Sequence, residues 1–409
     1  MRQILEGSNA IAKLINLINP GVVSAYPITP QTHIVEDLAK FKADGEGKYE
    51  YVRAESEFAA ASIVAGASAA GVRTYTATSS QGLLLMAEVV FNIAGMRLPV
   101  VMTVANRAVS APINIWNDQS DAMAVRDAGW IMLFAEDVQE TIAQHLLAYK
   151  VAEKLQIPVM VNLDGFILTH TLEPVALPDE KTIKKFLPDY KPKTGEYLDP
   201  ANPVTLGALA TPDHYMEIRQ DLNDDILASK KIISDEYEKL MNIFSLAETK
   251  NQKKDKIPAS SAGRRDMRYE IRDTGLTEYY GPKNPDIILV AMGSVIGTMK
   301  EAVDEWNADK KSAGHRVGIL KIKCFRPFPG KEIGKICEKT KKIAVIDKSI
   351  SLGHIGPLAS DLKAVLQKNP AEIKSFVVGL GGRDITRDMI KKIISDFKKF
   401  SADAPNFVG

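Results

Sequence analysis

Residues 73–105, RTYTATSSQGLLLMAEVVFNIAGMRLPVVMTVA, contain the pattern that decides the fold. Arg73–Ala77 and Leu98–Ala105 are short apolar, β-branched runs typical of buried strands, and Leu83–Ala94 between them has helical spacing. A strand, a helix and another strand in succession, with strands that are apolar on both faces, predict a parallel sheet covered by helices on each side.

The same alternation extends in both directions from this stretch. Ligands of parallel sheets bind beyond the carboxyl ends of the strands, so the segments that follow the strands are the candidates for function. Further strands are predicted over Gly21–Tyr26, Tyr49–Val52, Trp130–Phe134 and Ile157–Asn162, with helices over Glu57–Ala70 and Val138–Lys154.

Three parts are expected along the chain. Residues 1–171 form the first α/β domain, and residues 284–409 form a second, smaller one. Residues 172–283 are rich in proline and include a helical segment with mixed charges, Asp213–Leu246, which predicts a long, extended, partly helical connecting arm. The second domain is predicted to contain strands Ile287–Val290, Val317–Ile322, Lys342–Ile346 and Ser375–Val378, and helices Gly297–Asn307, Lys331–Lys341, Pro357–Gln367 and Ile385–Phe400.

The composition excludes several classes of protein. A net charge of +1 gives no reason to expect a nucleic-acid or membrane-surface partner. Met1–Ile15 has a helical pattern without a signal peptide, and no apolar run reaches membrane-spanning length, so a cytoplasmic protein is expected. Cys324 and Cys337 are expected to be reduced structural thiols, and two cysteines cannot hold a [4Fe–4S] cluster alone.

The first predicted strand runs into Tyr26-Pro27-Ile28-Thr29-Pro30. Two prolines forbid both continuation of the sheet and an early helix, so Thr29 is presented from a rigid turn at the carboxyl end of the strand. The alternative is a structural turn in which Thr29 caps the following helix.

Two glutamates, Glu55 and Glu57, follow the second strand. The helix after them is mostly alanine, glycine and serine, which implies close packing and a fairly dry site for one carboxylate. Burial favours the protonated form of a carboxyl and makes it a good group for sharing a proton. Alternatively, both glutamates only interact with the helix dipole.

Polar residues also follow the third and fourth strands. The segment Thr76–Gly82, with Gln81, suits a polar heterocycle or an anion, although ordinary helix capping would look the same. Arg107 ends a buried strand among apolar residues, where a bound carboxylate would satisfy its fork of donors. An internal ion pair with Asp118 or Asp121 is the alternative.

At these segments the sequence resembles the alpha subunit of the pyruvate:ferredoxin oxidoreductase group of 2-oxoacid:ferredoxin oxidoreductases. The resemblance covers almost the whole chain and is highly specific. The motifs that carry it are YPITP (Tyr26–Pro30), ESE around Glu57, GVRTYTATSSQGLLLM (Gly71–Met86), ANRA with SAPINIWND (Ala105–Asp118), FILTH (Phe166–His170), CFRPFP (Cys324–Pro329) and GLGGRD (Gly379–Asp384).

The resemblance implies that the first domain binds the pyrimidine half of thiamine diphosphate, and that the second resembles the carboxy-terminal domain of transketolase-like enzymes. Glu57 would contact the pyrimidine N1′, with Glu55 as a neighbouring alternative, and Pro27, Ile28 and Gln81 would lie at the cofactor. Thr29 and Arg107 would be catalytic residues that bind the substrate carboxylate.

The resemblance also implies the partners and the reaction. Beta, gamma and delta-type subunits would accompany the chain, with Mg²⁺ and the [4Fe–4S] clusters bound by the partners and no metal by this chain. The complex would convert pyruvate and coenzyme A to acetyl-CoA and CO₂, reversibly, and reduce ferredoxin. Alternatives are a branched-chain, aromatic or 2-oxoglutarate substrate, a lipoamide-linked thiamine enzyme, a scaffold subunit, or a dinucleotide site at Gly379–Gly382, which lacks the full glycine pattern.

Overall fold

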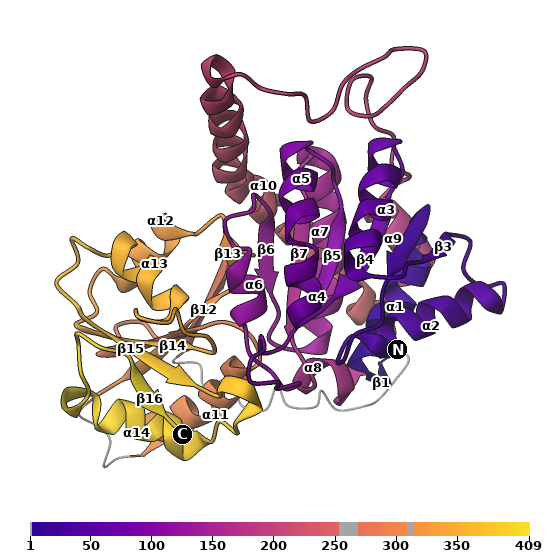
Figure 1. Ribbon diagram of the computed structural model, residues 1–409. Coiled ribbons are helices and arrows are strands. Elements are labelled where there is room, and N and C mark those ends of the chain that lie inside the picture. The colour runs from indigo at the N-terminus through magenta and orange to yellow at the C-terminus, as the bar shows by residue number, and fades with distance from the viewer. Residues whose placement is uncertain (1, 253–268, 310–314) are drawn as a thin grey trace.

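The computed structural model describes residues 2–252, 269–309 and 315–409. It contains two seven-stranded sheets, each flanked by helices, and a short two-stranded sheet (Figure 1). The predicted α/β fold with parallel sheets is confirmed.

The first sheet has the strand order β13-β6-β7-β5-β4-β2-β3, and its neighbouring strands from β6 to β3 are parallel. The six parallel strands coincide with the six predicted runs. They are β2 (Val22–Ala25), β3 (Glu50–Arg53), β4 (Thr74–Thr78), β5 (Val101–Asn106), β6 (Ile131–Phe134) and β7 (Val159–Asp164).

Helices cover both faces of this sheet. Figure 1 shows α4 and α5 in front of the strands and α7 behind them. The predicted helix over residues 83–94 is two helices that meet at the buried Met86. The helices of this region are α1 (Gly7–Ile18), α2 (Thr32–Ala43), α3 (Glu57–Ala69), α4 (Ser80–Leu85), α5 (Ala87–Gly95), α6 (Ser120–Ala124), α7 (Val138–Leu155) and α8 (Ile167–His170).

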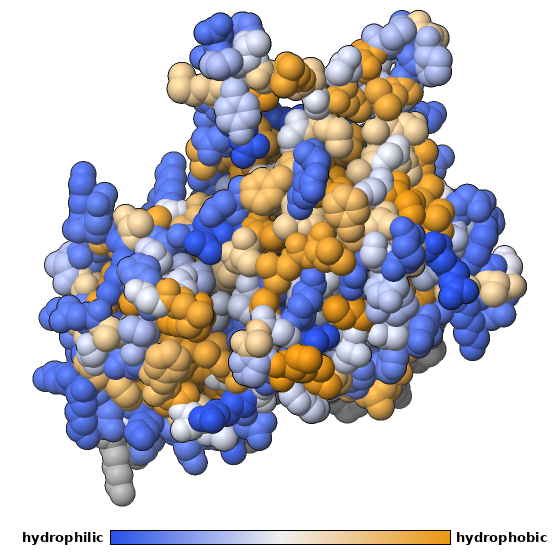
Figure 2. Space-filling model, viewed as in Figure 1, coloured by the Kyte–Doolittle hydropathy of each residue, from blue (hydrophilic) through white to orange (hydrophobic). Residues whose placement is uncertain are grey.

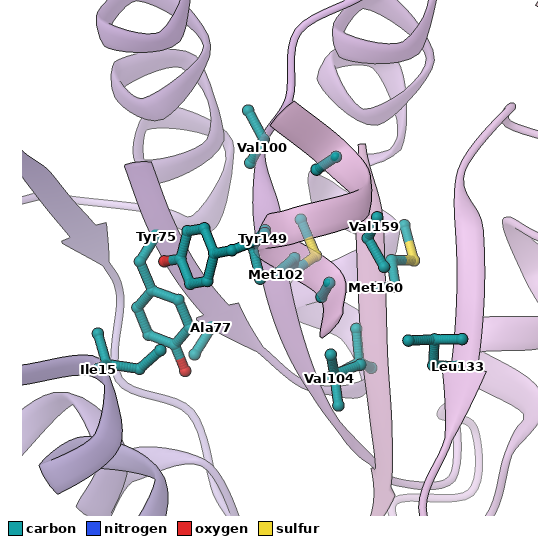
Figure 3. Close-up of a cluster of buried hydrophobic side chains, with 14 of the residues drawn as sticks. Ile15, Tyr75, Ala77, Val100, Met102, Val104, Leu133, Tyr149, Val159 and Met160 are labelled. Carbon is teal, nitrogen blue, oxygen red and sulfur yellow. The ribbon is translucent and has the colours of Figure 1, made fainter. Parts of the chain in front are cut away.

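In the core of the first sheet, the tyrosines Tyr75 and Tyr149 lie among aliphatic side chains (Figure 3). Their hydroxyls are satisfied internally: Tyr75 shares a hydrogen bond of 2.6 Å with Thr103 Oγ1, and Tyr149 donates to Thr74 O at 3.1 Å. Buried hydroxyls with partners cost little, so the two tyrosines are compatible with an apolar core.

The amino terminus differs from its predicted helical pattern. Gln3–Glu6 is a strand, β1, and the helix begins only at Gly7. β1 pairs antiparallel with β8 (Leu172–Val175), a strand in the predicted arm. A strand of four residues paired with a distant segment leaves little signal in the local sequence.

The predicted arm also contains α9 (Glu180–Phe186) and the long α10 (Pro212–Gln252). α10 packs against α7, and Lys154 Nζ lies 3.0 Å from Glu236 Oε1 between them. The end of the predicted arm belongs elsewhere: β9 (Tyr269–Asp273) is the edge strand of the second sheet, and β10 (Thr277–Pro282) lies next to it.

The second sheet has the order β16-β15-β14-β11-β12-β10-β9, with a parallel centre and an antiparallel edge made by β10 and β9. Two groups of buried apolar side chains form its core, and both contain residues of the strands and of the flanking helices. The remaining elements are β11 (Ile287–Ala291), α11 (Val295–Ala308), β12 (Val317–Ile322), α12 (Gly330–Cys337), β14 (Lys342–Asp347), α13 (Pro357–Val365), β15 (Glu372–Val378), α14 (Arg387–Ser395) and β16 (Asn406–Val408).

A strand and a cluster of buried charges are among the features that join the halves of the molecule. β13 (Cys324–Arg326) leaves the second domain and pairs antiparallel with β6 at the edge of the first sheet. Beside it, the buried Lys321 Nζ lies 2.7 Å from Glu136, 2.8 Å from Glu140 and 3.5 Å from Glu278. Burial disfavours the charged form of Glu140, but Lys321 and Lys323 outweigh it and lower its pKa to about 2.

Replacing Lys321 by alanine should destabilise the protein by roughly 3–5 kcal/mol, because it leaves three largely buried carboxylates with only Lys300 and Lys323 to balance them. Denaturant unfolding measures the loss. Lys231→Ala is the matched control, since Lys231 forms an exposed ion pair with Asp235 at 2.6 Å, and such pairs contribute about 1 kcal/mol or less. Equal losses in the two variants would contradict the prediction.

Candidate active site

The turn after β2 is tied to the end of β4. The side chain of Gln31 is fully buried, and its Nε2 donates to Tyr26 O at 3.0 Å and to Ala77 O at 2.8 Å. Pro27 and Thr29 are exposed in this turn, and Ile28 is half-buried. The alternative role for Thr29, capping the next helix, is wrong because α2 begins at Thr32 with Gln31 at its N-cap.

Glu57 is the first residue of α3, and its side chain is buried, with 7% of its surface exposed. Ser56 is the N-cap of α3 and accepts from Ala59 N at 3.2 Å, so the helix end does not need Glu57 as a cap. Among the described residues, no hydrogen bond or ion pair reaches the Glu57 carboxylate. Its neighbour Glu55 is exposed.

The start of α4 lies directly against Glu57. A Cβ added to Gly82 would be 2.7 Å from Glu57 Oε1 and 2.6 Å from Thr78 Oγ1, so only glycine fits there. Thr78 Oγ1 and Gln81 Nε2 are buried and have no hydrogen-bond partner in the described part of the chain. Thr78 Oγ1 and the Glu57 carboxylate both lie at Gly82, and Gln81 is the preceding residue of α4. Buried polar groups without a partner call for a ligand.

Hydroxyl groups fix the backbone between β4 and α4 to the end of β5. Ser79 Oγ donates to Ala105 O at 2.6 Å, and Ser80 Oγ donates to Ala108 O at 2.5 Å. Ser80 adopts a left-handed φ of 48°. Ser79 is the N-cap of α4 but makes no side-chain capping bond, so the capping alternative for this segment is wrong.

Arg107 follows β5, and its guanidinium reaches the Tyr26–Pro30 turn. Nη1 donates to Thr29 O at 2.8 Å, and Nε donates to Asn114 O at 3.3 Å. The alternative ion pair with Asp118 or Asp121 is absent among the described contacts. Partial burial lowers the pKa of Arg107, although Asp121 opposes this effect. The remaining guanidinium N–H groups have no acceptor in the described residues, so they can donate to a carboxylate ligand.

Asp121, in α6, holds together the start of α4 at Ser80 and the segment after β5 at Arg107. Its fully buried carboxylate accepts from Ser80 N at 2.9 Å, Arg107 N at 3.0 Å, Asn106 Nδ2 at 2.9 Å and Ala122 N at 2.7 Å. The sequence indicated Asp121 only as an alternative ion-pair partner for Arg107. Its actual role depends on four donors brought together by the tertiary fold.

Asp121 should also make stability depend on pH. Burial raises its pKa to about 7, from an ordinary value of 3.8. The folded chain therefore binds this proton more tightly than the unfolded chain, and the free energy of unfolding should fall as pH rises from about 4 to about 7. We expect this residue to contribute a fall on the order of 2 kcal/mol between pH 5 and pH 7.

The check compares urea unfolding of the wild type and of Asp121→Asn across this pH range. Asparagine does not titrate, so the variant should have a shallower decline, whatever its stability at pH 7. Parallel profiles for the two proteins would contradict the assignment.

A second polar group lies near the amino terminus. Glu6, His33 and His170 bring potential metal-ligating atoms within 4.8 Å of one another. His33 Nδ1 lies 2.7 Å from Glu6 Oε1, and this hydrogen bond raises the pKa of His33. The ion pair between Glu6 and His33 therefore explains why these two side chains lie together without a metal. The sequence analysis did not anticipate the group, whose members are far apart along the chain.

Both cysteines are buried free thiols, as predicted. Burial raises the pKa of Cys337 to about 12, which makes its thiol unreactive. Among the described residues, no helix has the length and apolar character needed to cross a membrane.

Two family descriptions match the chain. Residues 15–238 match the thiamine-diphosphate-binding domain of pyruvate flavodoxin/ferredoxin oxidoreductase, and residues 285–390 match core domain II of pyruvate:ferredoxin oxidoreductase. A solved structure of 2-oxoglutarate:ferredoxin oxidoreductase from Magnetococcus marinus has the same fold, with a TM-score of 0.66 and 21% sequence identity. The alignment covers 97% of this chain but only 65% of that one.

Relatives of similar length are considerably closer in sequence. Pyruvate synthase subunit PorA of Methanocaldococcus jannaschii is 45% identical, over 100% of this chain and 97% of the relative. PorA of Pyrococcus furiosus is 41% identical over 98% and 94%, and ketoisovalerate oxidoreductase subunit VorA of Pyrococcus abyssi is 39% identical over 98% and 94%. The resemblance seen in the motifs is thus confirmed along the whole chain, which belongs to the pyruvate:ferredoxin oxidoreductase family.

Proposed function

We propose that this chain is the alpha subunit of a multi-subunit oxidoreductase that oxidatively decarboxylates pyruvate with coenzyme A, yielding acetyl-CoA and CO₂ and reducing ferredoxin. The observation that carries the proposal is the buried carboxylate of Glu57, which has no partner among the described residues and lies in contact with the start of α4. A buried ion without a partner is costly, so its presence favours a ligand that completes it.

The residues fit the pyrimidine half of thiamine diphosphate. Glu57 would accept a hydrogen bond from the ring nitrogen N1′, and the unpartnered Gln81 Nε2 offers a donor nearby. The absence of a side chain at Gly82 keeps the cradle open. Thiamine diphosphate, when bound, supplies the nucleophile and the electron sink for decarboxylation of a 2-oxoacid.

Thr29 and Arg107 would bind the carboxylate of the substrate. The free N–H groups of Arg107 suit a bidentate carboxylate, and its bond to Thr29 O places the two residues side by side. Pro27 and Ile28, in the same turn, would line the cofactor side of this pocket. The chain's own contribution is therefore to orient the substrate and to hold a proton at N1′ of the cofactor.

The rest of the active site would come from partner subunits of beta, gamma and delta type. Apolar side chains are exposed on three adjacent helices: Phe58 on α3, Leu84 and Leu85 on α4, and Phe91 on α5. Figure 2 shows this apolar area on the face that carries α4 and α5. An exposed patch of this kind beside an incomplete site favours a beta-type subunit that brings the diphosphate and Mg²⁺.

Iron–sulfur clusters would also belong to the partners. The two cysteines of the chain are too few to ligate a [4Fe–4S] cluster. Electrons would pass to ferredoxin through those clusters, and the complex would be cytoplasmic.

Ferredoxin or viologen reduction by the complex purified through this subunit tests the proposal, with coenzyme A and a panel of 2-oxoacids. Turnover that requires coenzyme A and is specific to pyruvate would support it. Turnover with 2-oxoisovalerate instead would favour the second candidate, a branched-chain enzyme, because a VorA subunit is 39% identical. Transfer to lipoamide, or no turnover in a cluster-containing complex, would contradict the assignment.

A further inference from the structure

The glycine loop, Gly379–Gly382, follows β15 in the second domain and contacts the first domain. Asn114 Nδ2 donates to Gly381 O at 3.1 Å, and Gly382 N donates to Asn117 O at 2.8 Å. Residues 114–117 belong to the loop between β5 and α6, which also contacts Arg107. The glycine loop is thus connected to the Arg107 guanidinium through Asn114, which bonds to both.

Glycine is required at two positions of this loop. Gly381 and Gly382 have φ values of 62° and 81°. A Cβ on Gly381 would be 2.4 Å from Asn114 Nδ2, and one on Gly382 would be 2.4 Å from Trp116 Cβ. Both the backbone conformation and the close approach exclude other residues. The pattern that suggested a dinucleotide site therefore has a packing explanation.

Asn114 connects the glycine loop to Arg107. Its backbone carbonyl accepts from Arg107 Nε at 3.3 Å, and its Oδ1 accepts from Trp116 N at 2.7 Å. Because Nδ2 also bonds to Gly381, the side-chain amide of Asn114 is held at both of its polar atoms. Asn114 is thereby fixed in place, and its backbone carbonyl is the acceptor for Arg107. An arginine side chain loses rotamer entropy when it is ordered, and an acceptor that already holds it reduces this cost at the moment of binding.

We propose that the glycine loop, acting through Asn114, positions Arg107 for the carboxylate of the 2-oxoacid. The second domain is then part of substrate binding and does not serve assembly alone. Gly381 and Asn114 are positioning residues, and neither touches the substrate. The inference rests on the proposed function, in which Arg107 binds the carboxylate.

Steady-state kinetics of the assembled complex test it. Asn114→Ala removes the bond to Gly381 without backbone strain, and Gly381→Ala displaces Asn114. Each should raise the KM for pyruvate roughly 5- to 30-fold, which corresponds to a loss of about 1–2 kcal/mol in an ordering contact, with little change in kcat. The KM for coenzyme A and the affinity for thiamine diphosphate should not change. A general structural defect would change these two quantities as well.

Gly353→Ala is the matched control. Gly353 has a φ of 81° and no atom within 4 Å of an added Cβ, so alanine there adds the same strain without the contact. Its KM for pyruvate should equal that of the wild type. The double variant Asn114→Ala/Gly381→Ala should be no more impaired than the more impaired of the two single variants, since both act through one contact.

The outcomes separate the two levels of the argument. If Arg107→Ala leaves the KM for pyruvate unchanged, the proposed role of Arg107 fails. If Arg107→Ala raises it while Asn114→Ala and Gly381→Ala behave like Gly353→Ala, the positioning role is overturned and the proposed function stands. Should Gly381→Ala fail to assemble, the unstrained Asn114→Ala decides alone.

Discussion

Glu57→Gln should reduce kcat for 2-oxoacid decarboxylation by a factor on the order of 10²–10⁴, the usual contribution of a positioned acid–base group. Glutamine has the shape of glutamate and should fit against Gly82, where the carboxylate now lies. It cannot, however, carry the charge that holds a proton at the cofactor ring. The loss should therefore appear in turnover of the assembled complex and not in assembly.

The adjacent glutamate provides the control. Glu55 is two residues away and exposed, whereas Glu57 is 7% exposed. Glu55→Gln should keep activity within about twofold of the wild type, because an exposed charge is screened by water. If Glu55→Gln were the inactive variant, the identification of Glu57 as the pyrimidine contact would be wrong. Bound thiamine diphosphate, measured in each purified complex, distinguishes loss of chemistry from loss of cofactor.

Much of the first sheet could be predicted from local sequence. Runs such as Val101–Asn106 are buried along their whole length, and a buried parallel strand is recognisable as a continuous apolar run. The site segments could also be found, because parallel strands bring their carboxyl ends to one edge. This rule correctly anticipated that Thr29 and Arg107, far apart in sequence, are in contact.

The errors have physical causes. β13 has three residues and pairs with a sheet built from the other end of the chain, so its partner is decided by tertiary structure. No glycine or proline marks the break between α4 and α5 at Met86. β10 was also missed: Thr277–Pro282 alternates buried and half-buried residues in the folded protein, but its sequence, TEYYGP, does not alternate apolar and polar residues.

The choice between Glu55 and Glu57 shows where the sequence becomes insufficient. Both residues precede a helix of small side chains, and the composition does not distinguish them. The structure separates them in burial: the N-cap at Ser56 makes Glu57 the first residue of α3, with its side chain toward α4, and leaves Glu55 exposed. This difference is the basis on which Glu57 is proposed as the pyrimidine contact.

Arg107→Ala should cost roughly 2–5 kcal/mol of transition-state binding, or about 30- to 5,000-fold in kcat/KM for the 2-oxoacid, because truncation leaves the substrate carboxylate desolvated without its partner. Arg107→Lys should recover only part of this loss. Lysine keeps the charge but lacks the planar fork that bonds a carboxylate in two places while also bonding Thr29 O.

The same variants separate carboxylate binding from general damage. Arg316→Ala, at an exposed arginine in the second domain, should leave kcat/KM unchanged and serves as the control. The loss caused by Arg107→Ala should be similar for pyruvate and for longer 2-oxoacids, since the guanidinium contacts the carboxylate that all of them share. A loss confined to one substrate would instead mean that Arg107 lines the side-chain pocket, and the carboxylate would then need another cation.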